Sequence, residues 1–591
     1  MTVRSLLPAL ILAARFAFAS VDTEGASKLP DCSTVNRASS AYDYIVVGSG
    51  AGGGPVAARL AENGFSVLVV ETGVDQGNNI NTTSAAFALP VVEDTKLDLN
   101  YTIKEYPPDF PIQRNDIWYP RAAAIGGCTI HNAMANNIGG LRGTFDKLAK
   151  MFNDNTWTRD NMQKFWVLIE RNLYLTPPNP DHGFNGYIST TRIPENFSSA
   201  DPEWSALGSA IIPASGPLIP DINSHLPIPS FGRGLSTSTI DLAGNRSSVH
   251  DRLVQVAASH PDKLKLMTDT LATKVLLCKA HNNVVAYGLS VAPGAKLPIA
   301  GGFTGKHNLK ETQIFAKREV IVSAGAFQSP QLLMLSGIGD PAQLNKFGIQ
   351  TIVDLPGVGS NLQDNDELPV VWEFKNNFIP GDTTSWGEVF ATSNGSNPIE
   401  PDVDTYFVPA EFTGYRHGFV AIAAATPNFF SIINLKALAS SSGYVRLTGS
   451  HPQDLLDINK LRFQAPGGQQ DIVDLRERLK HWREVLTAPQ VAKFVEREVL
   501  PGANVTSDKE IDNYILENIF AHHACCTNPI GLKSDPQAVL DGNFNVYGVQ
   551  DLRVIDASSW PESPGYFPTS PTYMIAEKAA QVILNDAKKK N

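Results

Sequence analysis

A strand, a glycine-rich loop, a helix and a second strand follow one another near the start of the chain, in YDYIVVGSGAGGGPVAARLAENGFSVLVVETG. Residues 44–47 are consecutively apolar, as a strand of a parallel sheet that is buried on both faces requires. The pattern predicts a helix that runs from the loop through Leu60, and a second strand at 67–70 that ends at Glu71. This order of elements predicts an α/β nucleotide-binding domain with a parallel sheet.

The glycines of this loop stand at positions with different physical demands. Gly48 permits the tight turn, Gly50 lets the backbone approach a pyrophosphate, and Gly53 lets the helix pack closely on the strand. The helix N-terminus faces the phosphates, and Glu71 follows at the distance of an acid that accepts ribose hydroxyl groups. Together these features predict a dinucleotide site.

Length, charge and the first residues bound the class of protein. The chain has 591 residues and a net charge of −11. The length predicts more than one domain, and the acidic balance argues against binding to nucleic acid or to an anionic membrane surface. Residues 1–19 combine Arg4, an apolar run and an Ala-Phe-Ala cleavage site, so we expect a secretory signal peptide.

Sequons and cysteines add to the expectation of a secreted, extracellular protein. Asn-x-Ser/Thr triplets, which favour N-glycosylation, occur at Asn81, Asn100, Asn196, Asn245, Asn394 and Asn504. The cysteines number five, which is odd and does not suit a scaffold built from disulfides. Cys32 and Cys278 are the two that we consider for a pairing, which the sequence alone leaves open.

Further motifs lie along the rest of the chain. They are PRAAAIGGCTIHNAM at 120–134, GAFQSPQLLMLSGIG at 325–339, LPGVGSNLQDN at 355–365, LRVIDASSWPESPG at 552–565 and PTYMIAEKAAQVIL at 571–584. The first two resemble the signatures of the glucose–methanol–choline (GMC) oxidoreductases, which are FAD enzymes. The others resemble that family's loop before the substrate domain (with Asn365 where many members have histidine), its closing strand and its last helix. The resemblance runs from about residue 43 to residue 584 and implies FAD as the cofactor.

The resemblance implies two domains. A Rossmann-like FAD-binding domain with a parallel sheet would take residues 41–155, 225–365 and 540–588, and a substrate domain with an antiparallel sheet flanked by helices would take 156–224 and 366–539. Within the second signature, Ser329-Pro330 predicts the start of a helix. The residues implied to bind FAD are Gly48, Gly50, Gly53, Glu71, Arg121, Gly127, His131, Asn132, Ala133, position 274 (Lys274), Asp556 and Ala557. For Asp556, a purely structural role as a turn acid is the alternative.

The segment HACCTNPIG at 523–531 resembles the catalytic stretch of the family and makes His523 the implied base. An imidazole with an ordinary pKa near ~6.5 suits the acceptance of a hydroxyl proton. His522 precedes it, and a packed, hydrogen-bonded histidine is its alternative role. Since adjacent side chains on an extended stretch point to opposite sides, we expect no metal site here. Cys525 and Cys526 are expected to be buried free thiols.

One position departs from the usual family pattern, and another matches only a subgroup of the family. Phe567 stands where the second catalytic residue is usually histidine or asparagine. Groups that could work with His523 instead are Tyr566, Thr569, Ser570 and His522. An aromatic residue at this position favours a flat or apolar alcohol. His131 matches the residue through which choline-oxidising relatives attach FAD covalently. The resemblance therefore implies either a covalent bond from His131 to FAD or simple packing of His131 on the flavin edge.

The resemblance implies a secreted FAD-dependent alcohol oxidase or dehydrogenase. It would convert a primary or secondary alcohol, with an aryl alcohol favoured, to the carbonyl by hydride transfer to flavin N5, and would pass the electrons to oxygen or a quinone. Two alternatives stay open. One is a sugar oxidase or dehydrogenase whose pocket would use Trp386, Tyr406 or Tyr415 as platforms. The other is a non-redox lyase or cyclase on the same fold.

Overall fold

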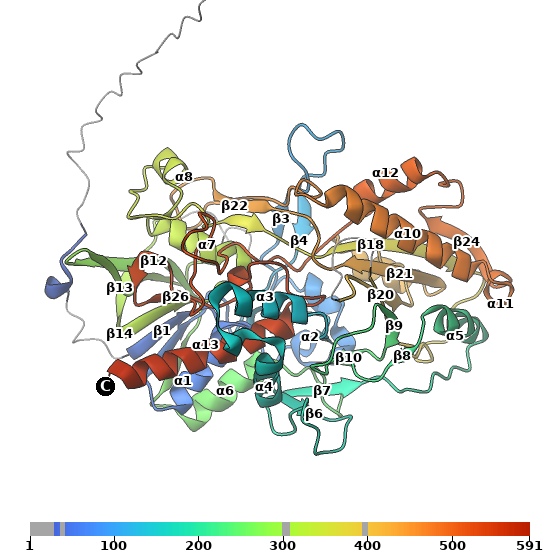
Figure 1. Ribbon diagram of the computed structural model, residues 1–591, viewed down its shortest axis with the longest axis horizontal. Coiled ribbons are helices and arrows are strands. Elements are labelled where there is room, and N and C mark those ends of the chain that lie inside the picture. Colours follow the sequence, from blue (N-terminus) through green and yellow to red (C-terminus); the bar gives the residue numbers. More distant parts are fainter. Residues whose placement is uncertain (1–28, 36–41, 298–307, 393–399, 591) are drawn as a thin grey trace, which may run out of the picture.

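The computed structural model describes residues 29–35, 42–297, 308–392 and 400–590. The predicted signal peptide at 1–19 and the sequon asparagine Asn394 lie outside these residues. Two large sheets lie on opposite sides of the molecule in Figure 1, one of them largely parallel and the other largely antiparallel. The predicted α/β architecture is therefore confirmed.

The first elements form as the glycine pattern predicts. They are β1 (Tyr42–Val47), α1 (Gly53–Glu62) and β2 (Val67–Val70), and β1 pairs in parallel with β2. Gly48 has a φ of +92°, which the tight turn requires. A Cβ atom on Gly53 would lie 2.1 Å from the carbonyl oxygen of Gly48. A side chain at Gly53 would therefore push α1 off β1, so the close packing depends on glycine.

The nucleotide-binding sheet has the strand order β11–β2–β1–β14–β13–β12, with β25 beside β13 and β26 beside β14. Its other strands are β11 (Leu264–Met267), β12 (Thr270–Ala280), β13 (Asn283–Pro293), β14 (Thr312–Val322), β25 (Val549–Gln550) and β26 (Leu552–Val554). β11, β2, β1, β14 and β26 run parallel, whereas β12, β13 and β14 pair in antiparallel fashion. All of these strands fall within the three segments predicted for the FAD domain.

Helices α1, α6 (Val249–Ser259) and α13 (Thr569–Lys590) pack together beside this sheet (Figure 1). Their apolar residues join those of the strands in the largest buried cluster of the described chain. β26 brings the C-terminal part of the chain next to β14, more than 200 residues away in sequence. The chain then enters the site region with Asp556.

Helix α7 (Gly325–Leu335) begins earlier than the start predicted at Ser329-Pro330, so Pro330 lies inside it. Proline has no N–H and cannot donate to the carbonyl of Ala326, four residues before it. Thr527 Oγ1 donates to that carbonyl at 2.6 Å instead. A side chain from the segment 523–531 thus replaces the missing helix bond, a long-range contact that the local pattern could not show.

The second sheet has the strand order β24–β18–β21–β20–β19–β9–β8. The strands are β8 (Leu218–Ile219), β9 (Phe231–Gly234), β18 (Asp366–Phe374), β19 (Glu388–Ala391), β20 (Val403–Val408), β21 (Phe429–Lys436) and β24 (Val495–Leu500). Helix α10 (Gly468–Leu486) packs on β21. β9 lies in a segment predicted for the FAD domain yet pairs with β19, so the segment contributes to both sheets.

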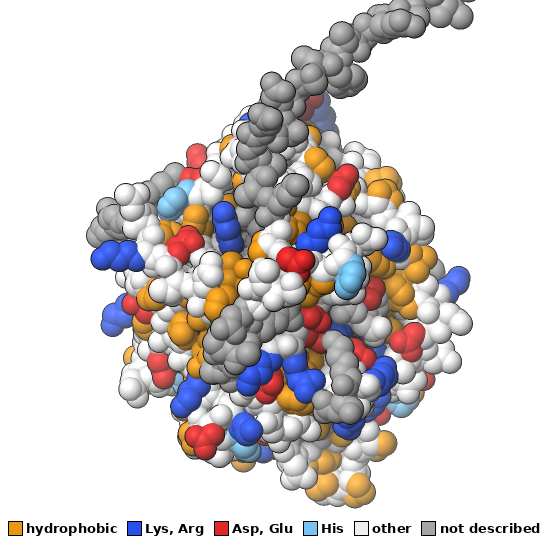
Figure 2. Space-filling model, turned by 90° about the vertical axis from the view of Figure 1, so that its left-hand side faces the viewer, with side chains coloured by type: hydrophobic (Ala, Val, Ile, Leu, Met, Phe, Trp, Pro, Cys, Tyr) orange, Lys and Arg blue, Asp and Glu red, His pale blue; other side chains and the backbone are white. Residues whose placement is uncertain are grey.

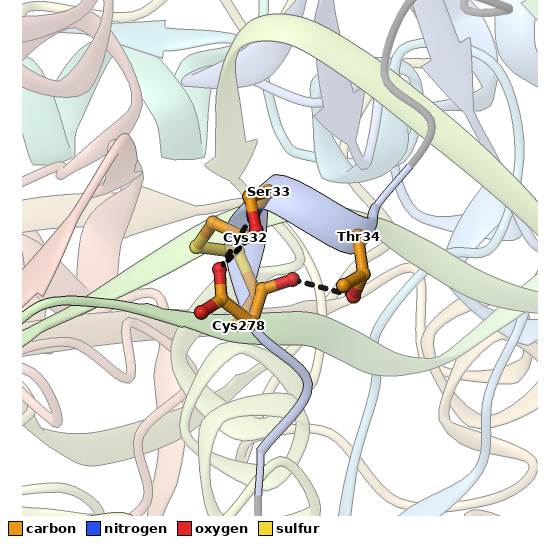
Figure 3. The surroundings of a disulfide bond; sticks show 5 residues. Cys32, Ser33, Thr34 and Cys278 are labelled. Atoms are coloured by element: carbon orange, nitrogen blue, oxygen red, sulfur yellow. Dashed lines mark hydrogen bonds between the residues drawn. A yellow bond between two sulfur atoms is a disulfide. The ribbon is translucent and has the colours of Figure 1, made fainter.

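A disulfide joins Cys32 to Cys278 on β12, as Figure 3 shows. It ties the short segment that contains Asp31 and Ser33 to the edge of the nucleotide-binding sheet, where Lys279 N also donates to Pro30 O at 2.8 Å. The pairing that the sequence left open is therefore present. Cys525 and Cys526 are buried and free, as expected.

The buried histidine His182 bridges the carboxylates of Glu170 and Asp221. His182 Nδ1 lies 2.7 Å from Glu170 Oε2, and its Nε2 lies 2.7 Å from Asp221 Oδ2. Burial alone would lower the pKa of His182, but the hydrogen bonds to Asp221 and Glu170 outweigh it and raise the pKa to about 9. The protonated imidazole is therefore favoured in the folded protein.

This cluster predicts that stability falls with rising pH. Because the folded-state pKa of His182 exceeds the unfolded value near ~6.5, its contribution is complete below that pH and is lost as the pH rises to about 9. We expect a loss on the order of 2–3 kcal/mol across this window. Urea midpoints at several pH values measure it. His182→Asn should be less stable near pH 6 and show a flatter profile; parallel profiles would contradict the assignment.

Two observations concern the surface charge and the possibility of a membrane-spanning helix. On the face shown in Figure 2, basic and acidic side chains are interspersed. Among the helices that the structure describes, none combines the length and apolar character needed to cross a membrane.

Candidate active site

A cavity of about 510 Å³ begins at the carboxyl ends of β1 and β2 and reaches the catalytic segment. It is lined by most of the predicted site residues, namely Gly48, Gly50, Glu71, Arg121, Gly127, His131, Asn132, Ala133, His522, His523, Asp556, Ala557 and Phe567. Gly53 is not among them because it serves the helix packing described above. Lys274 is exposed and does not line the cavity either. On β12, the residues that line the cavity are instead Thr270, Leu271 and Ala272. The structure therefore does not support position 274 as a cofactor-binding residue.

One end of the cavity is built from backbone that side chains would block. A Cβ atom on Gly52 would lie 2.0 Å from the carbonyl oxygen of Ile555, and one on Gly127 would lie 3.0 Å from Gly50 Cα. Three separate backbone segments therefore approach one another closely at the start of α1, and the glycines allow this approach. Such an arrangement suits a pyrophosphate, so the residues present fit FAD.

Both predicted cofactor acids also hold the protein backbone in place. Glu71 accepts hydrogen bonds from Ser49 N at 3.1 Å and from Gly73 N at 2.9 Å. Asp556 accepts one from Gly325 N at 2.8 Å. The structural alternative considered for Asp556 is thus present, and its place on the cavity wall also puts it beside the cofactor region. Burial raises the pKa of both carboxyl groups.

His131 lies on the cavity wall, and its Nε2 atom has no hydrogen-bond partner among the described residues. Burial lowers the pKa of His131 to about 3, and the charges of Arg121 and Arg246 act in the same direction. Arg246 Nη1 also donates to the backbone oxygen of Asn132, at 2.6 Å. The loop therefore places a neutral imidazole on the cavity wall, and its buried Nε2 has no hydrogen-bond partner among the described residues.

His522 and His523 reach the opposite end of the cavity together. Their ring centroids lie 4.0 Å apart, so the expectation that these adjacent side chains point to opposite sides is wrong. His523 N donates to Asp364 Oδ1, and Arg121 Nη2 donates to the carbonyl oxygen of His522, each at 2.7 Å. These contacts fix the backbone outside a regular strand, where the alternation of side chains does not apply.

Glu367, on β18, is fully buried beside both imidazole rings. Its Oε1 atom lies 3.2 Å from His522 Nδ1 and 3.8 Å from His523 Nδ1. Its other oxygen, Oε2, accepts a hydrogen bond from the hydroxyl of Tyr406. Oε2 is therefore held by a hydrogen bond, whereas Oε1, which lies near the two imidazole rings, has no hydrogen-bond partner among the described residues.

Asp364 is the second acid that sequence reasoning missed. It accepts a hydrogen bond from the hydroxyl of Tyr119 at 2.5 Å, and it pairs with Lys460 Nζ at 3.2 Å. The only available signal was the run of acids in QDNDELPV, which places charged residues at the start of an otherwise apolar strand. Asn365 between them donates to the carbonyl oxygen of Gly565 at 3.1 Å and so holds the loop that leads to Phe567.

An aromatic wall surrounds the two histidines. The ring of Phe567 meets that of His523 edge-on at 5.7 Å, and the ring of Tyr415 meets that of His522 at 4.6 Å. Tyr406 also lines the cavity, whereas Trp386 is buried in the core of the second sheet. Two of the three aromatic residues considered as platforms therefore reach the site.

The four candidates for a polar partner of His523 also divide into residues that line the cavity and residues that do not. The Tyr566 hydroxyl donates to the carbonyl oxygen of Pro401, and Ser570 Oγ donates to Asn136 Oδ1, each at 2.7 Å. Neither Tyr566 nor Ser570 lines the cavity, whereas Thr569 and His522 do. Of these four candidates, the structure thus places Thr569 and His522 on the cavity wall.

Residues 232–367 and 439–576 match the N-terminal and C-terminal parts of the GMC oxidoreductase family, and residues 43–123 match an FAD binding domain. The glucose methanol choline oxidoreductase atC of Aspergillus terreus is 30% identical over 625 residues, which cover 96% of this chain and 97% of that protein. The chain belongs to the GMC oxidoreductase family. It is therefore an FAD-dependent oxidoreductase, and the predicted family and cofactor are confirmed.

Further similar proteins also cover most of the chain. Choline oxidase of Arthrobacter globiformis is 29% identical over 564 residues, covering 92% of this chain and 94% of that enzyme. The crystal structure of pyridoxine 4-oxidase from Mesorbium loti superimposes with a TM-score of 0.75 at 24% identity, covering 91% of this chain and 98% of that one. The latter likeness supports the GMC fold.

The electrostatics of this GMC site favour a neutral base. Burial lowers the pKa of His523 to about 4, although the charge of Asp364 acts in the opposite direction. His523 is therefore uncharged near neutral pH and able to accept a proton. Burial raises the pKa of Glu367 to about 8, to which the negative charge of Asp364 contributes. Near neutral pH the folded protein therefore favours the uncharged forms of both side chains.

Proposed function

We propose that this enzyme oxidises the CH–OH group of an aromatic or otherwise apolar alcohol to the carbonyl, with His523 as the acceptor of the hydroxyl proton. When bound, FAD supplies the acceptor for the hydride that leaves the alcohol carbon. The two electrons then pass to oxygen or a quinone. The observation that carries the proposal is the position of His523 on the wall of the FAD cavity, edge-on to Phe567.

The shape and chemistry of the wall support an apolar substrate. Phe567 can neither accept nor donate a proton, so it offers the substrate a flat, apolar contact beside the base. Tyr406, Phe412 and Tyr415 continue the aromatic surface. A benzylic alcohol placed against this surface would direct its hydroxyl group to His523, with His522 or Thr569 as the second polar contact.

Anaerobic mixing of the holoenzyme with benzylic, aliphatic and sugar alcohols tests the proposal. We expect benzylic alcohols to bleach the flavin absorbance near ~450 nm fastest, because oxidised flavin is consumed as the alcohol is oxidised. Bleaching by sugars alone would overturn the substrate class. Bleaching by none of the alcohols would favour a lyase or cyclase. Reoxidation of the bleached enzyme by air or by a quinone then identifies the electron acceptor.

We also propose that the enzyme is exported and glycosylated. The signal-like residues 1–19 support export, and the Cys32–Cys278 disulfide suits an oxidising compartment. Of the sequon asparagines that the structure describes, Asn100, Asn196, Asn245 and Asn504 are exposed, while Asn81 is half-buried and donates to Asp94 Oδ2. Intact-mass measurement before and after glycosidase treatment of enzyme from the culture medium tests both points.

His131 is proposed to bind FAD covalently through Nε2, the buried nitrogen without a partner. His131 would hold the flavin by a bond from Nε2 to its 8α carbon. The flavin would supply the two-electron oxidation that this bond requires, with oxygen or a quinone as the final electron acceptor.

Acid precipitation provides the test of this bond. We expect wild-type protein to retain yellow flavin in the pellet, and His131→Ala to release it to the supernatant, because the variant lacks the bonding nitrogen. The absorbance spectrum of native His131→Ala serves as the control that the cavity still holds FAD. Release of the flavin from wild-type protein would restrict His131 to packing.

A further inference from the structure

Three ligand-type atoms converge behind the catalytic histidines. They are Glu367 Oε1, His522 Nδ1 and His523 Nδ1, and all lie within 4.8 Å of one another. Each is buried and has no hydrogen-bond partner among the described residues. Buried polar atoms are nearly always partnered in proteins. Three unpartnered atoms that face a common point therefore indicate a shared ligand.

The spacing of these atoms suits a metal ion better than direct hydrogen bonds. Glu367 Oε1 lies 3.8 Å from His523 Nδ1, which is too far for a hydrogen bond. Zinc binds imidazole nitrogen and carboxylate oxygen at about 2.0–2.2 Å in a tetrahedron, which places neighbouring ligand atoms about 3.3 Å apart. The separation of Glu367 Oε1 and His522 Nδ1 is 3.2 Å, and small side-chain rotations would bring His523 into the same range.

We propose that Glu367, His522 and His523 form a three-ligand site for a divalent transition-metal ion of the zinc and cobalt class, whose binding blocks alcohol oxidation. Two imidazoles and one carboxylate are the ligand set that such ions prefer over magnesium or calcium. Binding itself is independent of the proposed function, whereas the block rests on it. A fourth coordination position remains for water, as in zinc sites with three protein ligands.

The surroundings supply what metal ligands require. Tyr406 donates to Glu367 Oε2, which fixes the carboxyl group and leaves Oε1 for the ion. Such support of ligands by a further hydrogen bond is a regular feature of metal sites. The buried network around the histidines holds the carboxyl groups of Glu105, Asp364, Asp366 and Glu367 beside the cations Arg114, Arg121, Lys460 and Arg462. Glu367 would release its proton when the ion binds, and its carboxylate then offsets part of the ion's charge.

The same geometry explains why the ion would stop the reaction. A metal ion on Nδ1 of His523 leaves the imidazole hydrogen on Nε2. The nitrogen that is not directed at Glu367 then carries a proton and cannot take another from the alcohol. His522 is held in the same way, so neither histidine remains a proton acceptor.

Titration of the holoenzyme with Co²⁺ tests the site without reference to activity. Tetrahedral cobalt absorbs in the red, beyond the flavin bands, so we expect a saturable signal at one ion per chain. Glu367→Gln, which removes the charged ligand atom, should weaken binding at least tenfold, and His522→Ala gives a second variant should Glu367→Gln fail to fold. His481→Asn, which removes an imidazole on α10, should bind Co²⁺ as the wild type does. Absence of the band, or equal affinity in Glu367→Gln, would overturn the site.

A second measurement separates this inference from the proposed function. With a reactive alcohol, one equivalent of Zn²⁺ should prevent anaerobic bleaching, and a chelator should restore it. Bleaching that continues with Zn²⁺ bound would refute the block. If no alcohol bleaches the flavin even without Zn²⁺, the proposed function fails, while the cobalt band still decides whether the site exists.

Discussion

Replacement of His523 by glutamine is expected to slow the reduction of bound FAD by alcohol about 10²–10⁴-fold. Glutamine keeps a polar side chain on the cavity wall but cannot accept the hydroxyl proton. His523 is the histidine in edge contact with Phe567, and its backbone is held by Asp364, so the imidazole has a fixed place on the cavity wall. Anaerobic stopped-flow measurement of flavin bleaching gives the rate directly.

Two controls make this result specific. The flavin content and visible spectrum of His523→Gln should match the wild type, because no cofactor contact is removed. His481→Asn, which alters a histidine in the other sheet's helix layer, should bleach at the wild-type rate. If His522→Asn lost the reaction and His523→Gln retained it, His522 would be the base and the assignment made from the HACCTNPIG segment would be wrong.

The cofactor end of the site could be predicted because its causes are local. The turn at Gly48 and the close packing at Gly53 act within one strand–loop–helix unit, so the glycine spacing alone fixes β1, α1 and β2. Position 274 failed because the register of β12 against the cavity depends on its pairing with β13, which no local pattern records. The local sequence thus predicted the conformation of the glycine loop, but it could not predict which residue of β12 faces the cavity.

The catalytic end depended on contacts between distant segments. Glu367 lies at the start of β18 and Asp364 just before it, more than 150 residues before His523, so their approach is set by the sheet and not by the motif. The shared direction of His522 and His523 has the same origin, since Arg121 and Asp364 fix that backbone. The motif therefore placed His523 at the cavity, whereas the carboxyl group behind it could be found only from the fold.

Replacement of Arg462 by methionine is expected to lower the free energy of unfolding by about 3–5 kcal/mol, because it would leave buried carboxylates without their main partner. Arg462 is fully buried, its Nε donates to Glu105 Oε2 at 2.7 Å, and its Nη1 pairs with Asp366. Burial alone would raise the pKa of Glu105, and the guanidinium of Arg462 instead holds it below its ordinary value. Lys460, 3.3 Å from Asp366, would compensate only part of the loss.

Urea unfolding of holoenzyme compared with Arg497→Met measures this effect against a matched control. Arg497 pairs with Glu373 at 2.7 Å, but its side chain is 63% exposed, so its loss should cost less than about 1 kcal/mol. Equal losses in the two variants would show that Arg462 contributes no more than a surface pair. Because Asp366 directly precedes Glu367 on β18, the loss of Arg462 should also loosen the carboxyl group beside the histidines. Weaker Co²⁺ binding in Arg462→Met than in Arg497→Met would then connect the stability of this network to the geometry of the site.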